Sequence, residues 1–143
     1  MKQIFSTFLL LGVVIYAQAG PPAASVGDAR VRLLPGDLPL AGYFVITSDA
    51  PKPLRLVGAT SPDFGGVMLH QSVEEGGVAR MAHVEGVTIG PGQSVEFSPG
   101  GYHLMLMGSK QTLHVGDEVP ITLRFSGGQE LAVRFKVVGA RGE

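Results

Sequence analysis

The chain has 143 residues, a length that fits one domain with a single hydrophobic core. Its 11 Lys and Arg against 12 Asp and Glu give a net charge of −1, which provides no electrostatic reason to expect binding to nucleic acid or anionic lipid. It has no cysteine, and this excludes thiol redox catalysis, cysteine-type zinc sites and blue-copper electron transfer, because each needs a thiolate.

Residues 1–19 predict a cleaved secretory signal. Lys2 supplies a positive start, residues 4–16 form an apolar run, and Ala17-Gln18-Ala19 has the small-x-small pattern that signal peptidase recognises. The apolar run is too short to span a bilayer comfortably, so a transmembrane anchor is the less favoured interpretation. We expect no stable membrane insertion after cleavage.

The residues that follow predict a short lead and then one domain of strands. Residues 20–28 are rich in Pro and Ala and predict a flexible lead, whereas residues 29–143 predict a single domain. From Val31 onward the pattern is of short strands separated by turn residues. The earlier strands are expected at 42–47, 54–60, 67–72, 78–84 and 102–107.

Near the C-terminus, apolar and polar residues alternate cleanly. Apolar residues occupy every second position of 119–125 and of 131–137, and Gly127-Gly128 between these segments predicts a hairpin. No window has a sustained helical period, so little helix is expected. The chain therefore predicts an all-β fold, either an antiparallel sandwich or a Greek-key barrel.

Methionine and histidine side chains gather in the stretch from residue 68 to residue 107. On alternating strands, His103, Met105 and Met107 share a face, and Met68 and His70 share another. Met81 and His83 share a third face if their segment is extended. We expect a β-sandwich to bring these segments together. The cluster contains Met68, His70, Met81, His83, His103, Met105 and Met107.

This mixture of donors points to Cu(I). Thioethers are soft, neutral donors that bind Cu(I), and imidazoles add affinity without adding charge. Zinc sites in proteins use thiolate, imidazole or carboxylate ligands, and calcium sites use clustered carboxylates. Taken singly, each residue has an ordinary explanation, because a Met in a strand usually packs in the core and a lone His usually makes ordinary hydrogen bonds. Only the histidines compete with protons, so copper affinity is expected to weaken below about pH 6.

The spacing of four of these residues resembles the signature of the PCu(A)C family of periplasmic copper chaperones. That signature is a His, ten residues, a Met, twenty-one residues, and then His-x-Met. Here ten residues separate His70 from Met81, twenty-one separate Met81 from His103, and Leu104 precedes Met105. Other stretches look similar to the family over about residues 29–138, including 41–44, 56–59, 67–70 and 100–108.

The resemblance implies a cupredoxin-like β-barrel with one Cu(I) site near solvent, held by His70, Met81, His103 and Met105. It also implies a carrier in the periplasm that directs copper toward the dinuclear centre of cytochrome c oxidase. The partners would then be copper-donating or copper-accepting proteins, such as an oxidase subunit or a thioredoxin-like copper protein. The carrier is expected to be a monomer.

The chain departs from the family pattern in two places. Gln71 stands where the family often has a Met after the first His, and Met68 is a candidate replacement. No His/Met-rich extension follows residue 138, so a second high-capacity site is not expected. Met107 and His83 are secondary candidates for metal contact, and His114 is expected at the surface.

Two other function classes compete with the carrier. A metal-free β-sandwich that binds a partner protein is the alternative, because fold alone does not exclude it. An enzyme is not expected, because the cluster lacks carboxylates at a spacing suited to hydrolysis and two thioethers would bias copper toward Cu(I).

Overall fold

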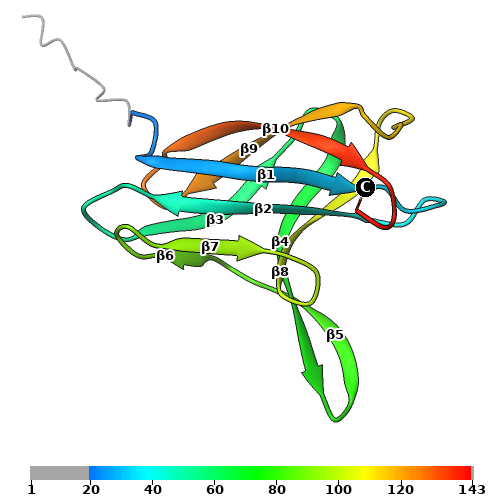
Figure 1. The fold of residues 1–143 in the computed structure, drawn as a ribbon, viewed down its shortest axis with the longest axis horizontal. Coiled ribbons are helices and arrows are strands. Elements are labelled where there is room, and N and C mark those ends of the chain that lie inside the picture. Colours follow the sequence, from blue (N-terminus) through cyan, green and yellow to red (C-terminus); the bar gives the residue numbers. More distant parts are fainter. Residues whose placement is uncertain (1–19, 143) are drawn as a thin grey trace, which may run out of the picture.

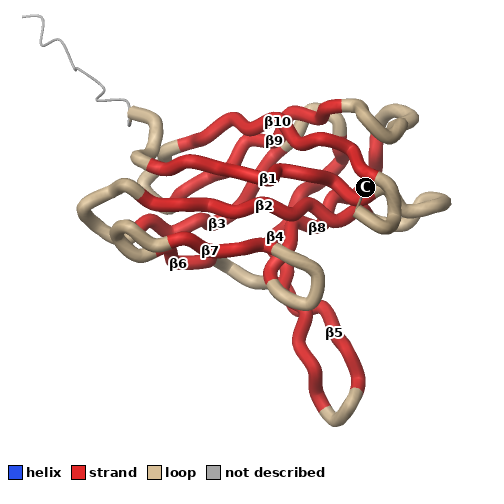
Figure 2. Tube along the Cα trace, in the orientation of Figure 1, coloured by secondary structure: helices blue, strands red, loops and turns tan. Residues whose placement is uncertain are grey.

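The computed structural model describes residues 20–142, which form ten β-strands (Figure 1). The expected signal, residues 1–19, lies outside the described residues. The strands are β1 (Ala24–Arg32), β2 (Leu40–Ser48), β3 (Leu54–Thr60), β4 (Phe64–Glu75), β5 (Val78–His83), β6 (Val87–Ile89), β7 (Ser94–Phe97), β8 (Tyr102–Ser109), β9 (Glu118–Phe125) and β10 (Glu130–Val138). Figure 2 shows only strands and loops for these residues. None of the described residues forms a helix with the length and hydrophobicity that a membrane crossing needs.

The strands form one sheet that curls round a core. Its order is β5-β4-β8-β7-β2-β1-β10-β9-β3-β6, and β2 also pairs with β8. The paired strands are antiparallel except β1–β10 and β7–β8. Strand β3, near one end of the order, packs against β4, near the other end. The two ends therefore meet, and the predicted all-β fold is confirmed.

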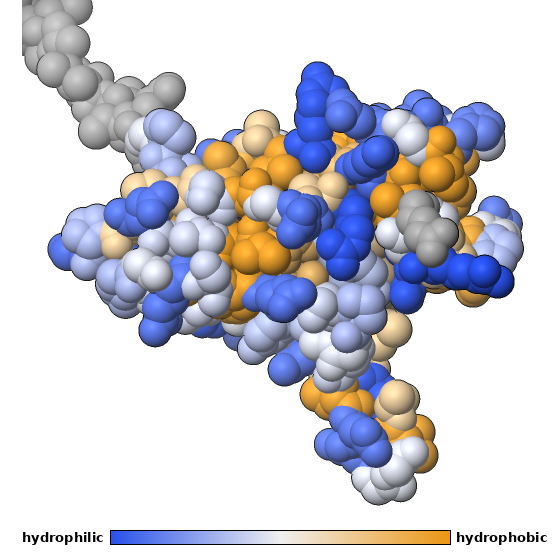
Figure 3. Space-filling view, in the orientation of Figure 1, coloured by the Kyte–Doolittle hydropathy of each residue, from blue (hydrophilic) through white to orange (hydrophobic). Residues whose placement is uncertain are grey.

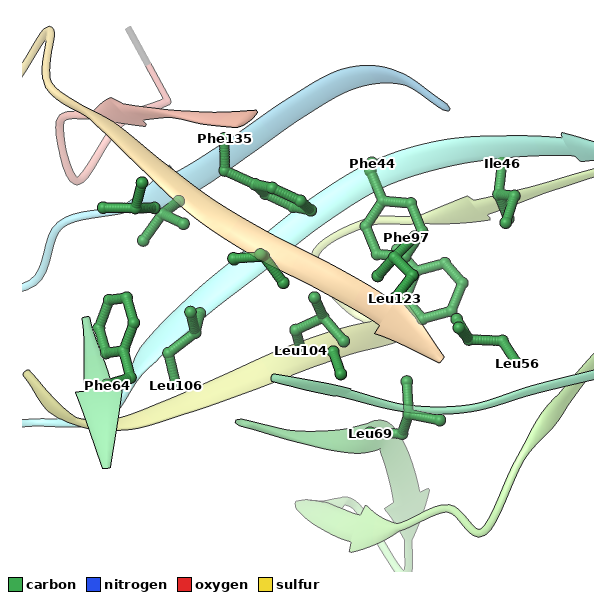
Figure 4. Packing of buried hydrophobic residues seen from close by; sticks show 14 of the residues in the cluster. Phe44, Ile46, Leu56, Phe64, Leu69, Phe97, Leu104, Leu106, Leu123 and Phe135 are labelled. Carbon is green, nitrogen blue, oxygen red and sulfur yellow. The ribbon is translucent and has the colours of Figure 1, made fainter. Parts of the chain in front are cut away.

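The core is filled by the inward positions of the alternating strands. Phe44 stacks on Phe97 with ring centroids 4.2 Å apart and meets the edge of Phe135 at 5.7 Å (Figure 4). Leu104 and Leu106 of β8 are buried in the same cluster. Burying large apolar side chains supplies the main driving force for such a fold, at about 1.5–3 kcal/mol for each.

The hairpin predicted at Gly127-Gly128 is confirmed. Leu131 pairs with Leu123 and Val133 with Ile121 in the β9–β10 register. Gly128 has a φ of +80°, a conformation that glycine adopts without steric cost.

The expectation for residues 20–28 and for the first strand is corrected by the structure. Strand β1 begins at Ala24, whereas strands were expected only from Val31 onward, and residues 24–27 of the expected flexible lead are paired with β2. The β1–β2 register shifts between Gly27 and Arg30, and Asp28 has a φ of +52°. This β-bulge interrupts the alternation that sequence reasoning relies on.

Two short strands also differ from the expectation. Strands β6 and β7 lie in residues 85–97, where no strand was predicted. Strands β6 and β7 span three and four residues, too few for a periodic pattern to identify. Strand β3 has the bounds predicted for it, and the other predicted strands overlap the observed ones with longer or slightly shifted ends.

Candidate metal centre

The β4–β5 hairpin extends beyond the rest of the sheet (Figure 1). Its two-residue turn is Gly76-Gly77, and both glycines have positive φ, +59° and +78°. Such a turn matches the twist of an antiparallel hairpin and suits glycine at both positions. The turn therefore fixes the register in which β5 lies against β4.

That register places three histidines in a row across neighbouring strands. His70 of β4 is opposite His83 of β5 on one side and opposite His103 of β8 on the other. The centroid of the His70 ring lies 6.0 Å from that of the His83 ring and 5.8 Å from that of the His103 ring. Residues directly opposite one another point to the same side of a sheet. We call these three residues the histidine row.

Methionines flank the histidine row on both sides. Met81 is opposite Ser72, two positions beyond His70 along β4, and 66% of its surface is exposed. Met105 follows His103 by two positions and is opposite Met68. All of these side chains lie on the outer face of the sheet, because Leu69 and Leu104 point into the core.

Three of the predicted donors line a common cavity of about 440 Å³. Met81, His103 and Met105 form part of its wall, and most of the rest is apolar. The other lining residues are Arg32, Leu34, Leu38, Pro39, Leu40, Ala41, Tyr43, Ser72, Pro99 and Gly100. They include no Asp or Glu, so neutral donors face a space without a carboxylate. His70 is not part of this wall.

The histidines have unused nitrogen atoms. Both ring nitrogens of His70 and Nε2 of His103 are buried, and none has a hydrogen-bond partner among residues 20–142. His103 Nδ1 lies 3.4 Å from the carbonyl oxygen of Gly101. Buried polar atoms without partners cost free energy, so these nitrogens are suited to a ligand that accepts their lone pairs.

The electrostatics of the row favour a neutral imidazole at His70. Burial lowers the pKa of His70 below its ordinary 6.5, and the neighbouring His103 and His83 imidazoles lower it further. A neutral imidazole keeps a lone pair free for a metal ion.

Imidazoles and carboxylates alone do not make a ready metal site in the described part of the chain. Within residues 20–142, no three His, Asp or Glu side chains are grouped so that they could hold one ion together. The histidines form a row instead of converging on one point. A site with three or more protein donors for one ion on this face therefore needs the thioethers.

The structure also adds residues that the sequence did not single out. The Arg30 and Arg32 guanidinium groups lie 5.7 and 5.5 Å from the centre of the Tyr43 ring. Arg32 and Tyr43 line the cavity, and Arg32 Nε is buried without a hydrogen-bond partner among the described residues. The sequence signal for Tyr43 is its place in segment 41–44, which looks similar to the family, and in the structure Ala41 of that segment pairs with Met105. No such signal existed for Arg32, because β1 was not predicted.

Two other residues lie apart from the row. Met107 is opposite Gly66, and its methyl group lies against that glycine. His114 is exposed beside Asp117 in the loop before β9, which confirms its surface placement.

Comparisons with known proteins place the chain in a family. Residues 24–137 match the family described as "Putative lipoprotein LpqE-like". The "Uncharacterized protein RP573" of Rickettsia prowazekii (strain Madrid E) is 35% identical over 98 residues, which are 68% of this chain and 54% of that protein. The chain spans about half the length of the curated relatives it matches.

Solved structures share the fold. The solution structure of CuI-DR1885 from Deinococcus radiodurans is 35% identical, with a TM-score of 0.65, and the match covers 82% of this chain and 78% of that one. The copper-bound PCuAC domain from PmoF2 is 24% identical, with a TM-score of 0.68, covering 87% and 97% respectively. The resemblance to PCu(A)C proteins and the cupredoxin-like fold that it implied are confirmed. The chain therefore belongs to the LpqE-like family, and its fold is that of the PCuAC domains.

Proposed function

We propose that this protein is a copper chaperone, which binds one Cu(I) ion through His70, Met81, His103 and Met105 and passes it to a partner protein. The observation that carries the proposal is that the four residues, spaced as in the PCu(A)C signature, lie on one outer face of β5, β4 and β8. Three of them share a cavity whose lining includes no carboxylate. A relative with 35% identity was solved as CuI-DR1885, and this supports copper as the ion.

The donor set suits a carrier. Two thioethers and two imidazoles are neutral, so Cu(I) adds only one positive charge to an apolar surface. His70 and His103 are the stronger anchors, since both nitrogens of His70 and Nε2 of His103 are buried without a hydrogen-bond partner among the described residues. Met81 is on the exposed hairpin, where a partner's ligands can replace it first.

The secondary candidates have different roles in this proposal. Met68 lies opposite Met105 and can stand in for the Met that the family often has at position 71. Met107 packs against Gly66 and is outside the ligand set. His83 is treated separately below.

We propose the following cellular setting. The signal is cleaved after residue 19, the protein is exported to the periplasm, and the remaining chain acts as one copper-binding domain without enzymatic activity. An oxidase subunit or a thioredoxin-like copper protein receives the ion for the copper centre of cytochrome c oxidase. Intact-mass measurement of protein recovered from the periplasmic fraction tests the cleavage position.

A Cu(I) titration tests the ligand set. Apo protein is titrated anaerobically in the presence of a competing chromogenic chelator, and one ion per chain is expected. The double variant His103→Ala, Met105→Ala should lose at least about tenfold in affinity, equivalent to about 1.4 kcal/mol. His114→Ala, which changes an exposed histidine outside the cluster, is the control and should bind as the wild type does. Unchanged affinity in the double variant would falsify the ligand assignment, and a chain that binds no Cu(I) would favour the metal-free interaction module.

A further inference from the structure

His83 stands outside the spacing pattern of the proposed Cu(I) ligands, yet its side chain is beside His70. The Val84 amide donates to the Leu69 carbonyl oxygen at 3.0 Å, so Leu69 and Val84 form a hydrogen-bonded pair of the β4–β5 ladder. In an antiparallel ladder the two pair types alternate. His70 and His83 are therefore a non-hydrogen-bonded pair, the type with Cα atoms about 4.5 Å apart, and their ring centroids lie 6.0 Å apart.

His103, the other neighbour of His70, belongs to the other type of antiparallel pair. The Ser72 amide donates to the Gly101 carbonyl oxygen at 3.0 Å, so the pair two positions away, His70 and His103, is of the hydrogen-bonded type. Such pairs have Cα atoms about 5.5 Å apart. The two pair types place His83 and His103 on either side of His70 with similar ring separations, 6.0 and 5.8 Å.

The surroundings of this pair also differ from those of the cavity. The His83 side chain is exposed on β5, which is an edge strand of the sheet. Water can therefore complete the coordination of an ion held there. Both His70 nitrogens lack partners among the described residues, so one is available to an ion on the His83 side.

We infer that His70 and His83 form a two-imidazole chelate for a divalent first-row cation, of the class that prefers nitrogen donors. Cu(II) is the strongest binder of this class at sites of nitrogen donors, followed by Ni(II) and Zn(II). The chelate shares His70 with the proposed Cu(I) site but uses no thioether. The inference goes beyond the Cu(I) carrier and does not rest on it. Together with the Cu(I) site proposed above, it implies that the two ions compete for His70.

The test is a Cu(II) titration of apo protein against glycine as a competing ligand, followed by electron paramagnetic resonance of the bound ion. His83→Asn keeps a polar side chain of similar size on an exposed edge position and removes the imidazole. It should lower Cu(II) affinity at least about tenfold and remove one nitrogen from the spectrum. His114→Asn, the matched exposed control, should change neither. His70→Asn should abolish the same Cu(II) signal.

A second measurement separates this inference from the proposed function. Anaerobic Cu(I) affinity of His83→Asn should stay within about twofold of the wild type, because the Cu(I) ligands are intact. Adding Cu(I) to the Cu(II)-loaded wild type should release Cu(II). Wild-type Cu(II) affinity and spectrum in His83→Asn would overturn the chelate while leaving the carrier proposal intact. Failure of the wild type to bind Cu(I), with the Cu(II) result as expected, would overturn only the carrier.

Discussion

His70 lies at the centre of the histidine row, and both of its neighbours are imidazoles. Its two nitrogens are buried without hydrogen-bond partners in the described part of the chain. A buried imidazole in this setting is costly in the protonated form, because neither solvent nor an acceptor stabilises the charge. The same features that lower its pKa leave lone pairs free for a metal ion.

The pKa of His70 predicts how the stability of the apo protein depends on pH. The folded-state pKa lies below the ordinary 6.5, so between the two values the unfolded chain binds more protons than the folded chain. The free energy of unfolding should therefore fall as the pH drops through 6.5 and level off below the folded-state pKa. Urea unfolding of the wild type and of His70→Asn at pH 7.5 and pH 5 measures this.

The His70→Asn variant should lose less stability between these two pH values than the wild type. His114→Asn should keep the wild-type dependence, since His114 is exposed and outside the row. An equal pH dependence in wild type and His70→Asn would contradict this explanation.

Met81 offers the cleanest test of a single sulfur. It is 66% exposed, so Met81→Leu should change the free energy of unfolding by no more than about 0.5 kcal/mol. Leu is similar in size but has no thioether, and Cu(I) affinity should fall about tenfold. Met107→Leu removes a sulfur that packs against Gly66 and should leave affinity unchanged. Equal affinities for the two variants, measured by chelator competition, would remove Met81 from the ligand set.

At the scale of elements, the β4–β5 hairpin determines which residues meet on the outer face. A one-residue shift in its register would move Met81 and His83 to the opposite face, away from His70. The hairpin projects from the sheet, and Figure 3 shows hydrophobic surface on it, where Val78 and Met81 are exposed. It receives little support from the core, so its own turn must hold the register.

A substitution in this turn should therefore affect copper more than the core. Gly77→Val places a β-branched residue at a φ of +78°, a strain of about 1–3 kcal/mol. Gly128→Val imposes the same strain at +80° in the β9–β10 hairpin, away from the cluster. Cu(I) affinity should fall in Gly77→Val only, with faster amide hydrogen exchange in residues 74–83. Unchanged exchange and affinity in Gly77→Val would show that the turn does not set the register.

The elements that sequence reasoning predicted well are those with regular alternation. Strands β9 and β10 were clear because their buried residues recur at every second position. Strand β1 was missed because a bulge at Asp28 breaks the alternation and small residues precede it. Strands β6 and β7 are held by their neighbours and are too short to be read from a periodic pattern.

The candidate site was only partly predictable for a related reason. The spacing of His70, Met81, His103 and Met105 predicted one shared face, because face and register follow from alternation and a tight turn. The cavity wall could not be predicted in the same way. Arg32 and Tyr43 reach it through the pairing of β1 with β2, a contact between segments whose register depends on the bulge.

At the scale of the whole molecule, the same strands serve two purposes on their two faces. Leu69 and Leu104 on the inner faces of β4 and β8 are buried in the core, whereas His70 and His103 are on the outer faces. The core thus holds His70 and His103 in place, while the exposed hairpin carries Met81 and His83. This division suits a protein that must hold an ion at fixed anchors and release it through a movable ligand.

X-ray absorption at the copper edge of the Cu(I)-loaded protein tests the central claim most directly, because it reports the atoms bound to the ion. The account predicts sulfur and nitrogen neighbours in about equal numbers, and loss of the sulfur contribution in the double variant Met81→Leu, Met105→Leu. A spectrum with nitrogen or oxygen neighbours alone, or one that the double variant leaves unchanged, would contradict it.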